Sequence, residues 1–262
     1  MSLIINGKNV NKVVIDGVET PSVYYRKGEG EFSLVFTKDP TWIEFKPLDP
    51  FGDGSTKAFL TFDGDTLDKV GSYNGVATGT TFKTGKFNQA IEINSSGANV
   101  SINKQDLIDF TKTFAISFWI KPLVENSSYQ GVFSKPVPSG QNFSPFCIHK
   151  VNNKLQYFLT SANSVWNISS GTLGINNITL NEWHHLVFQR TTSGYKAYVN
   201  GVLDFSIDTT TNLWINTHNY LIGTAFPGTQ DFKGQVDNFR VFNRDLTLEE
   251  INRLFTEKAL IL

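Results

Sequence analysis

Short runs of residues with alternating apolar and polar side chains recur along most of the chain, and turn-forming residues separate them. In the run 114–120 Phe114, Ile116, Phe118 and Ile120 occupy every second position, so they share one face of a strand, which we expect to be buried. Trp119 then points to the opposite face, and so large a ring there indicates that a loop or strand packs outside the sheet. Repeated runs of this kind are typical of an antiparallel sandwich rather than of alternating strands and helices. Strands are expected at residues 58–62, 90–93, 114–121, 131–134, 146–150, 155–160, 184–189, 195–199, 220–222 and 234–242.

Two local motifs add a hairpin and a helix. Asn200-Gly201 joins two alternating runs, and Asn-Gly favours the tight hairpin turn in which both central residues take positive φ. Near the other end of the sandwich, Thr247 and Glu250 have the spacing of a capping box. Apolar residues then recur on one face, which predicts a short amphipathic helix after Asp245.

The first part of the chain has a different pattern, a repeat of about ten residues in which apolar triplets alternate with turns, at 3–7, 13–17 and 23–28. Asn6-Gly7 and Asp16-Gly17 predict hairpin turns, and further strands are expected at 31–36 and 42–45. Two interpretations remain open: a small β-meander packed on the sandwich, or an element for docking and oligomerisation, because short hairpins are marginal alone. The turn-rich segment around residues 49–55 suggests a boundary between a module at 1–55 and a sandwich at 56–262.

Composition narrows the classes of partner. The chain has 262 residues, enough for one large all-β domain with a small appendage. Its 23 Lys and Arg balance 24 Asp and Glu, so we expect neither nucleic acid nor an anionic membrane as a partner. No apolar run approaches the roughly 18 to 20 residues of a membrane span, and residues 1–7 do not read as a Sec signal peptide. With Cys147 as the single cysteine, an intrachain disulfide is impossible.

Six segments in order resemble one family. They include 58–65, 85–93 and 181–187, while 114–122 is similar to the family strand FTISFWVKP and 232–246 to its closing motif. Together with Asn200-Gly201 they resemble the laminin-G-like, concanavalin A-like lectin/glucanase family. The resemblance implies an all-β, two-sheet antiparallel jelly-roll sandwich closed at one end by the helix after Leu246. That fold serves adhesion, sugar binding and passive structure alike, so it does not fix the function. The segment 1–55 is similar to N-terminal anchoring modules of bacteriophage structural proteins.

The sequence offers no pattern for catalysis. Hydrolases related to this family carry an alternating Glu-x-Asp-x-x-Glu run, which is absent here, so we expect no enzyme. His184 and His185 are neighbours on a predicted strand and point to opposite faces, so they cannot converge on one metal ion. Cys147 and His149 share a face, but no third ligand matches their spacing, and a buried structural thiol is the simpler interpretation.

Calcium is the cofactor that the resemblance implies, because many relatives place this ion beside the opening and closing strands. Asp63, Asp65 and Asp237 are the matching carboxylates, and Ca²⁺ prefers such oxygen ligands. The alternative is that Asp63 and Asp65 only shape a turn, with Asp237 as a satisfied polar residue beneath a loop.

Candidate sugar-binding residues are aromatic side chains in loops rich in Asn, Ser and Gln, because aromatic rings stack on the apolar faces of sugars. Trp166 and Trp214 have this setting most clearly. Tyr129, Tyr220 and Phe143 complete the set. The alternative for each Trp is a residue at the edge of the core.

These patterns favour a non-catalytic phage virion protein of the capsid or tail. Residues 1–55 would bind other virion proteins and form a homo-oligomer, while the sandwich would be displayed on the virion surface for adhesion or for binding host-surface polysaccharide. Such a protein is made in the host cytoplasm and needs no signal peptide. The alternative is a carbohydrate-binding or adhesion domain of a bacterial surface protein, located at the cell surface or outside the cell. A third hypothesis is a divergent glycan lyase or hydrolase.

Overall fold

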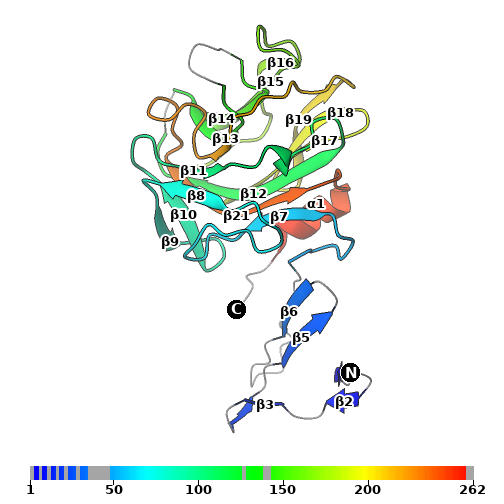
Figure 1. Ribbon diagram of the computed structural model, residues 1–262. Helices are drawn as coiled ribbons and strands as arrows, with labels where there is room; N and C mark the ends of the chain where they lie inside the picture. The colour runs from blue at the N-terminus through cyan, green and yellow to red at the C-terminus, as the bar shows by residue number, and fades with distance from the viewer. Residues whose placement is uncertain are drawn as a thin grey trace.

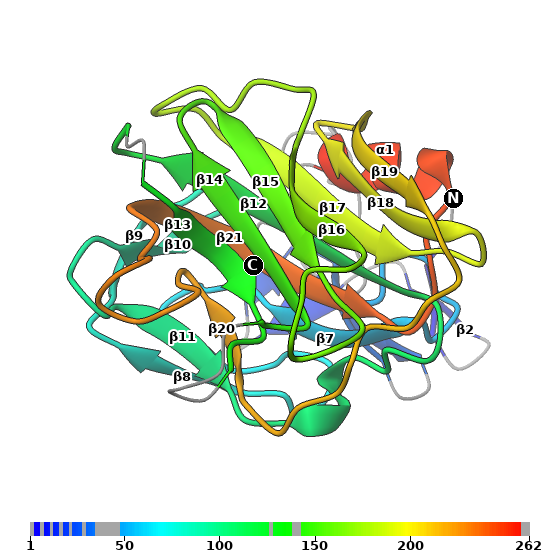
Figure 2. The ribbon, with the colours of Figure 1, turned by 90° about the horizontal axis from the view of Figure 1, so that it is seen from above.

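Two antiparallel β-sheets packed face to face form the body of the protein (Figure 1). The computed structural model describes residues 48–125, 128–137 and 143–257, and the backbone of the strands between residues 3 and 34. Figure 2 shows β14 and β15 of one sheet lying in front of β12 and β21 of the other. The two-sheet sandwich expected from the alternating pattern is confirmed.

The eight-stranded sheet is built around β21, the last strand of the sandwich. One edge of β21 pairs with β12, and its other edge pairs first with β10 and then with β7. In spatial order the strands are β19 (Val202–Asp208), β18 (Gly194–Val199), β17 (His184–Arg190), β12 (Phe114–Pro122), β21 (Gly234–Phe242), β10 (Gln89–Ile93) and β9 (Thr81–Thr84). The eighth strand, β7 (Thr56–Leu60), pairs with β21.

The seven-stranded sheet faces it and carries the long hairpin β14–β15. Its strands in spatial order are β16 (Ser169–Leu173), β15 (Lys154–Leu159), β14 (Phe146–Val151), β13 (Gln130–Ser134), β20 (Tyr220–Ile222), β11 (Asn99–Ile102) and β8 (Gly75–Thr78). A single 3₁₀ turn, η1 (Gln105–Leu107), follows β11.

The hydrophobic core lies between the sheets and is rich in aromatic rings. Phe133 of β13 is near its centre, with its ring centroid 5.0 Å from that of Phe239, 5.2 Å from Phe146 and 6.2 Å from Phe118. The apolar residues of the run 114–120 that share one face all belong to this core. The predicted inward face of this strand is therefore confirmed.

A helix covers the outer face of the eight-stranded sheet. Thr247 and Glu250 form the predicted capping box at the start of α1 (Leu248–Phe255). The ring of Phe255 stacks on Trp119 with centroids 5.9 Å apart. The cover expected outside Trp119 is thus a helix and not a loop or strand. In the described part of the chain, no helix is both long and apolar enough to cross a membrane.

The N-terminal repeats form separate two-stranded hairpins (Figure 1). Among the described strands, each hairpin pairs only within itself. The turns predicted at Asn6-Gly7 and Asp16-Gly17 and the strand predicted at 42–45 lie outside the described residues. The hairpins are β1 (Leu3–Ile5) with β2 (Lys8–Val10), β3 (Val13–Ile15) with β4 (Val18–Thr20), and β5 (Val23–Lys27) with β6 (Gly30–Leu34).

The turn-rich segment before β7 contacts the sandwich. The ring of Phe51 lies 5.4 Å from that of Phe242, and Asp53 forms an ion pair of 2.7 Å with Arg244. Asp49 accepts a hydrogen bond of 2.9 Å from the Thr56 hydroxyl. Residues from Asp49 onward therefore pack with the sandwich. An N-terminal deletion that leaves the sandwich intact has to end before Asp49.

Candidate functional site

The hairpin β14–β15 presents functional side chains on the outer face of the seven-stranded sheet. Successive residues of a strand point to opposite faces. Ile148 and Tyr157 point inward and belong to the core. Their neighbours His149 and Phe158 therefore point outward.

Aromatic rings form a continuous row on this outer face. The centroid distances are 5.4 Å from Phe143 to Trp166, 5.1 Å from Trp166 to Phe158, 5.9 Å from Phe158 to Tyr129 and 5.2 Å from Tyr129 to His149. Trp166 is half-buried, whereas 43% of Tyr129 is exposed. We call these five residues the aromatic row. The row thus combines the partly covered ring of Trp166 with the solvent-exposed ring of Tyr129.

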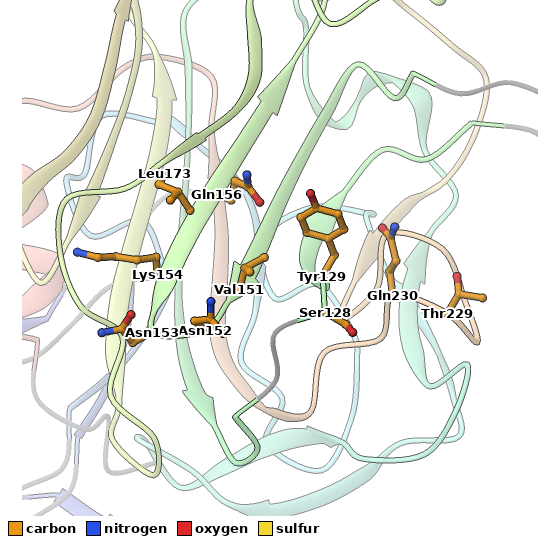
Figure 3. Close-up of a pocket in the computed structure, with 10 residues that line it drawn as sticks. All are labelled: Ser128, Tyr129, Val151, Asn152, Asn153, Lys154, Gln156, Leu173, Thr229 and Gln230. Carbon is orange, nitrogen blue, oxygen red and sulfur yellow. The ribbon is translucent and has the colours of Figure 1, made fainter.

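A groove of about 750 Å³ runs beside the aromatic row (Figure 3). Tyr129 is the ring of the row that lines it, and most other lining groups are amides and hydroxyls. Lys154 is the charged residue among the lining side chains, and no carboxylate is among them. The lining residues are Ser128, Tyr129, Val151, Asn152, Asn153, Lys154, Gln156, Leu173, Thr229 and Gln230.

Gly171 of the edge strand β16 makes room for two of these outward side chains. Its φ is +92°, and a Cβ built there would lie 2.5 Å from the ring of Phe158 and 2.8 Å from the amide nitrogen of Gln156. A larger residue would therefore push both side chains away from the sheet. Their present positions depend on glycine at this point.

His149, the last ring of the aromatic row, is a neutral base. Burial lowers the pKa of its imidazole to about 4, although a hydrogen bond to Gln230 acts in the opposite direction. The two atoms of that bond, Nε2 of His149 and Oε1 of Gln230, are 3.0 Å apart. The ring is therefore uncharged at neutral pH.

The structure separates the predicted sugar-binding residues. Trp166, Tyr129 and Phe143 come together in the aromatic row. Trp214 lies half-buried in the segment before β20, where its backbone N–H donates to the carbonyl of Thr160 at 3.2 Å. Trp214 is not among the residues of the row or of the groove.

Tyr220 has to be removed from the predicted set. It is fully buried, and its ring stacks on Phe133 inside the core with centroids 6.2 Å apart. The ammonium of Lys135 lies 3.9 Å from its ring centroid. Both ring faces are therefore unavailable to a sugar.

The sequence missed Phe158, His149, Gln156 and Gln230 as site residues. The alternation in the predicted strand 155–160 could have placed Gln156 and Phe158 on one face, opposite the core residues. No sequence signal indicated that Gln230 would meet His149, because 81 positions separate them along the chain.

The three carboxylates of the predicted calcium site do not converge. Asp65 forms an ion pair of 2.9 Å with Lys69, while Asp63 accepts a hydrogen bond of 2.9 Å from the Gln89 backbone. Among the residues that the structure describes, no three His, Cys, Asp or Glu side chains are grouped so that they could hold a metal ion. The predicted set of three is therefore not assembled in this structure, where Asp65 pairs with Lys69.

Asp237 is the unusual member of this set. It is fully buried on β21, its Oδ2 accepts a hydrogen bond of 2.9 Å from the Phe87 N–H, and its Oδ1 has no partner. Burial raises the pKa of its carboxyl group to about 8, and the charge of Asp63 acts in the same direction. Asp237 is consequently protonated over most of the neutral range.

Comparison with known proteins agrees with this architecture. A family model described as the concanavalin A-like lectin/glucanases superfamily matches residues 94–252. No curated protein matches the sequence. The matched region begins just after β10 and extends into α1.

Solved structures of similar fold include binding modules and a domain of an enzyme. Domain 4 of AbnA, a GH43 extracellular arabinanase from Geobacillus stearothermophilus, in complex with arabinotriose, has a TM-score of 0.59 and 21% identity, covering 77% of this chain and 98% of that one. The binding domain of Paraclostridial Mosquitocidal Protein 1 has a TM-score of 0.64 and 17% identity, with 77% and 52% covered. Trypanosoma rangeli sialidase has a TM-score of 0.61 and 13% identity, with 77% and 32% covered. This chain thus spans about half of the toxin domain and a third of the sialidase, and these identities show a common fold alone.

Proposed function

The chain belongs to the concanavalin A-like lectin/glucanase superfamily, and from this membership we propose that it is a non-catalytic protein that binds a saccharide on the aromatic row and in the groove. The aromatic row is the observation that carries the proposal. Sugars expose apolar C–H faces that stack on aromatic rings, and their hydroxyls bond to amides placed nearby. Tyr129 supplies an exposed ring beside the amides of Gln156 and Gln230.

The dimensions of the groove support this proposal. Its volume of about 750 Å³ is within the range of roughly 300 to 1,000 Å³ that is usual for small-ligand sites. Among the similar structures, domain 4 of AbnA was solved with arabinotriose bound. We therefore include arabinan among the saccharides to be tested.

We expect Trp166→Ala to weaken saccharide binding about tenfold or more, equal to about 1.4 kcal/mol, because Phe143 and Phe158 then lose the ring that joins them. The measurement is calorimetry and affinity electrophoresis of the full chain against arabinan, galactan, mannan and dextran. Trp214→Ala is the matched control and should bind like the parent. The proposal is wrong if the parent binds none of a broad saccharide panel, or if the two Trp variants lose binding equally. Release of reducing ends from a bound polysaccharide would instead indicate an enzyme.

The location that we propose is the surface of a phage virion, of capsid or tail, with the N-terminal hairpins as the attachment to other virion proteins. Short hairpins have unpaired edges and little buried surface, so they gain stability by pairing with another chain. A repeat of about ten residues over the first part of the chain offers several such edges in series. The alternative is a saccharide-binding or adhesion domain of a bacterial surface protein.

Deleting residues 1–47 is expected to give a folded monomer, whereas the full chain should form a homo-oligomer through its hairpins. The deletion ends before Asp49, so the contacts of Phe51 and Asp53 with the sandwich remain. Analytical ultracentrifugation measures the mass of both proteins, and unchanged thermal unfolding of the sandwich is the control. An oligomer that survives the deletion, or a full chain that is monomeric at all concentrations, would contradict the attachment role.

Calcium is a secondary proposal, in which Asp63 and Asp237 would be the carboxylate ligands. Without the ion, Asp237 binds more protons in the folded protein than in the unfolded chain between about pH 4 and about pH 8, because folding raises its pKa. Below about pH 6.5 His149 and His185 act in the opposite direction, because burial lowers their pKa values. The free energy of unfolding should therefore fall as pH rises through the window from about pH 6.5 to about pH 8, by up to about 2 kcal/mol.

Asp237→Asn should abolish that pH slope, whereas Asp65→Asn, the control, should keep it. Urea unfolding across the window measures the slope. Millimolar Ca²⁺ should raise the melting temperature of the parent near pH 8 but not that of Asp237→Asn, because the ion stabilises the deprotonated carboxylate. A melting temperature that responds to neither Ca²⁺ nor chelator would reject the ion but leave the pH slope intact.

A further inference from the structure

Two buried hydrogen-bond acceptors on the outer face of β14 and β15 have no partner. They are Nδ1 of His149 and Oε1 of Gln156. The two residues are directly opposed across the strand pair, so their side chains are neighbours on one face of the sheet. Buried polar atoms without a partner are rare, and each one needs a physical explanation.

The hydrogen bonds of the two side chains establish that both atoms are acceptors. Nε2 of His149 lies 3.0 Å from the side-chain oxygen of Gln230, which can only accept, so Nε2 carries the proton and Nδ1 is a bare lone pair. The amide nitrogen of Gln156 donates to the carbonyl of Gly171 at 2.7 Å, so the other amide atom, Oε1, is the acceptor that is left without a donor. The pair therefore lacks two donors.

Tyr129 lies over this part of the groove floor. Its ring centroid is 5.2 Å from that of His149, and Figure 3 shows the ring between the side chains of Gln156 and Gln230. With 43% of its surface exposed, Tyr129 is held mainly by ring contacts with His149 and Phe158. Exposed side chains change rotamer within nanoseconds, and a rotated Tyr129 would no longer lie over His149.

We infer that His149 and Gln156 form a polar subsite beneath Tyr129, where two neighbouring hydroxyl groups of an uncharged saccharide donate hydrogen bonds to Nδ1 and Oε1. The inference rests on the proposed function and specifies the ligand class of the same site. A hydroxyl pair fits because both acceptors are neutral and their side chains stand side by side. A cationic donor does not fit, because Lys154 is the charged group of the groove and no carboxylate lines it.

In the free protein the two unpaired acceptors lower the stability of the fold. A purely structural role for these side chains would not explain that loss. Unfilled buried acceptors destabilise the fold, and replacing them with apolar groups of similar shape is neutral or stabilising. His149→Phe keeps a ring between Tyr129 and Phe158, and the half-exposed Gln230 can turn to water. Gln156→Met keeps a chain of similar length, and water can replace the donor that the carbonyl of the half-exposed Gly171 loses. Both variants should therefore keep or raise the melting temperature while they weaken binding.

The test measures binding and stability together in the full-length protein. The probes are arabinan, galactan, mannan and dextran, each native and after periodate oxidation and borohydride reduction, which destroys adjacent hydroxyl pairs. We expect His149→Phe and Gln156→Met each to raise Kd about tenfold. The polysaccharide that the parent binds in its native form should no longer bind after oxidation and reduction. Asn94→Ala, at an exposed position after β10 that is not among the residues lining the groove, is the matched control and should bind like the parent.

Each outcome decides between the subsite and the proposed function. A native probe that binds the parent and His149→Phe equally well overturns the subsite and leaves saccharide binding intact. Equal binding of native and oxidised probes also overturns it. Variants that lose melting temperature together with affinity show a structural role for His149 and Gln156, with ordered water as the missing donor. If the parent binds none of the probes, the proposed function fails on these ligands and the inference fails with it.

Discussion

Replacing Arg240 with methionine is expected to lower the free energy of unfolding by about 3 to 5 kcal/mol, because it breaks a buried ion pair by removing the guanidinium that binds the carboxylate of Glu257. Arg240 is 1% exposed and forms two parallel hydrogen bonds to Glu257, of 2.6 and 2.9 Å. Its guanidinium also lies 3.9 Å from the ring centroid of Phe59. One side chain of β21 thus binds both β7 and the segment after α1.

Urea unfolding of Arg240→Met measures this effect, and Arg253→Met, on the exposed side of α1, is the matched control with an expected change below about 1 kcal/mol. The double variant Arg240→Met with Glu257→Leu should recover part of the loss, because neither charge of this pair then remains buried. Equal effects of the two Arg variants would show that the pair contributes nothing beyond a surface ion pair.

Gly131→Ala is expected to destabilise the protein by about 3 kcal/mol or more and to abolish saccharide binding. A Cβ at Gly131 would lie 2.1 Å from the backbone nitrogen of Ala225 and 2.5 Å from the carbonyl carbon of Thr224. Backbone atoms cannot give way as a flexible side chain can, so the loop has to move. The N–H of Gly131 also donates to the carbonyl of Gln230 at 2.8 Å, and Gln230 lines the groove.

The control for this substitution is Gly54→Ala. Gly54 has a φ of +74°, and the space around its Cβ position is open. Alanine there should therefore destabilise the protein only through the left-handed backbone conformation, by about 1 to 2 kcal/mol. Thermal unfolding and calorimetry with a bound saccharide separate the two variants. If Gly131→Ala is no more destabilising than Gly54→Ala and binds normally, the loop is more adaptable than its packing indicates.

Local pattern predicted the fold well where strands are long and buried. The run 114–120 shows its two faces plainly, and Thr247 with Glu250 specifies the start of α1 through contacts only three residues apart. Local pattern did not indicate β8, β9, β11 and β16, which have four or five residues each. Three of them are mostly exposed edge strands, and two apolar positions in β11 are too few to establish a period.

The candidate site was predicted in part. Composition of the loops identified Trp166 and Tyr129, whereas Phe158 and Gln156 become site residues only through the register of β14 against β15. Tyr220 has polar neighbours in sequence like those of Trp166, but β20 turns its ring into the core. Which face of a strand is exposed to solvent depends on where the second sheet packs. No local sequence pattern specifies that position.

The central position of β21 has a consequence for the order of events during synthesis. Residues of β21 complete the eight-stranded sheet by joining β12 to β10 and β7, yet they are translated after every other strand of the sandwich. A nascent chain therefore carries unpaired edges on β12, β10 and β7 until this segment leaves the ribosome. Such non-local closure is slow, and exposed edges invite pairing between chains. The yield of soluble protein should thus depend on the time between translation of β12 and release of β21.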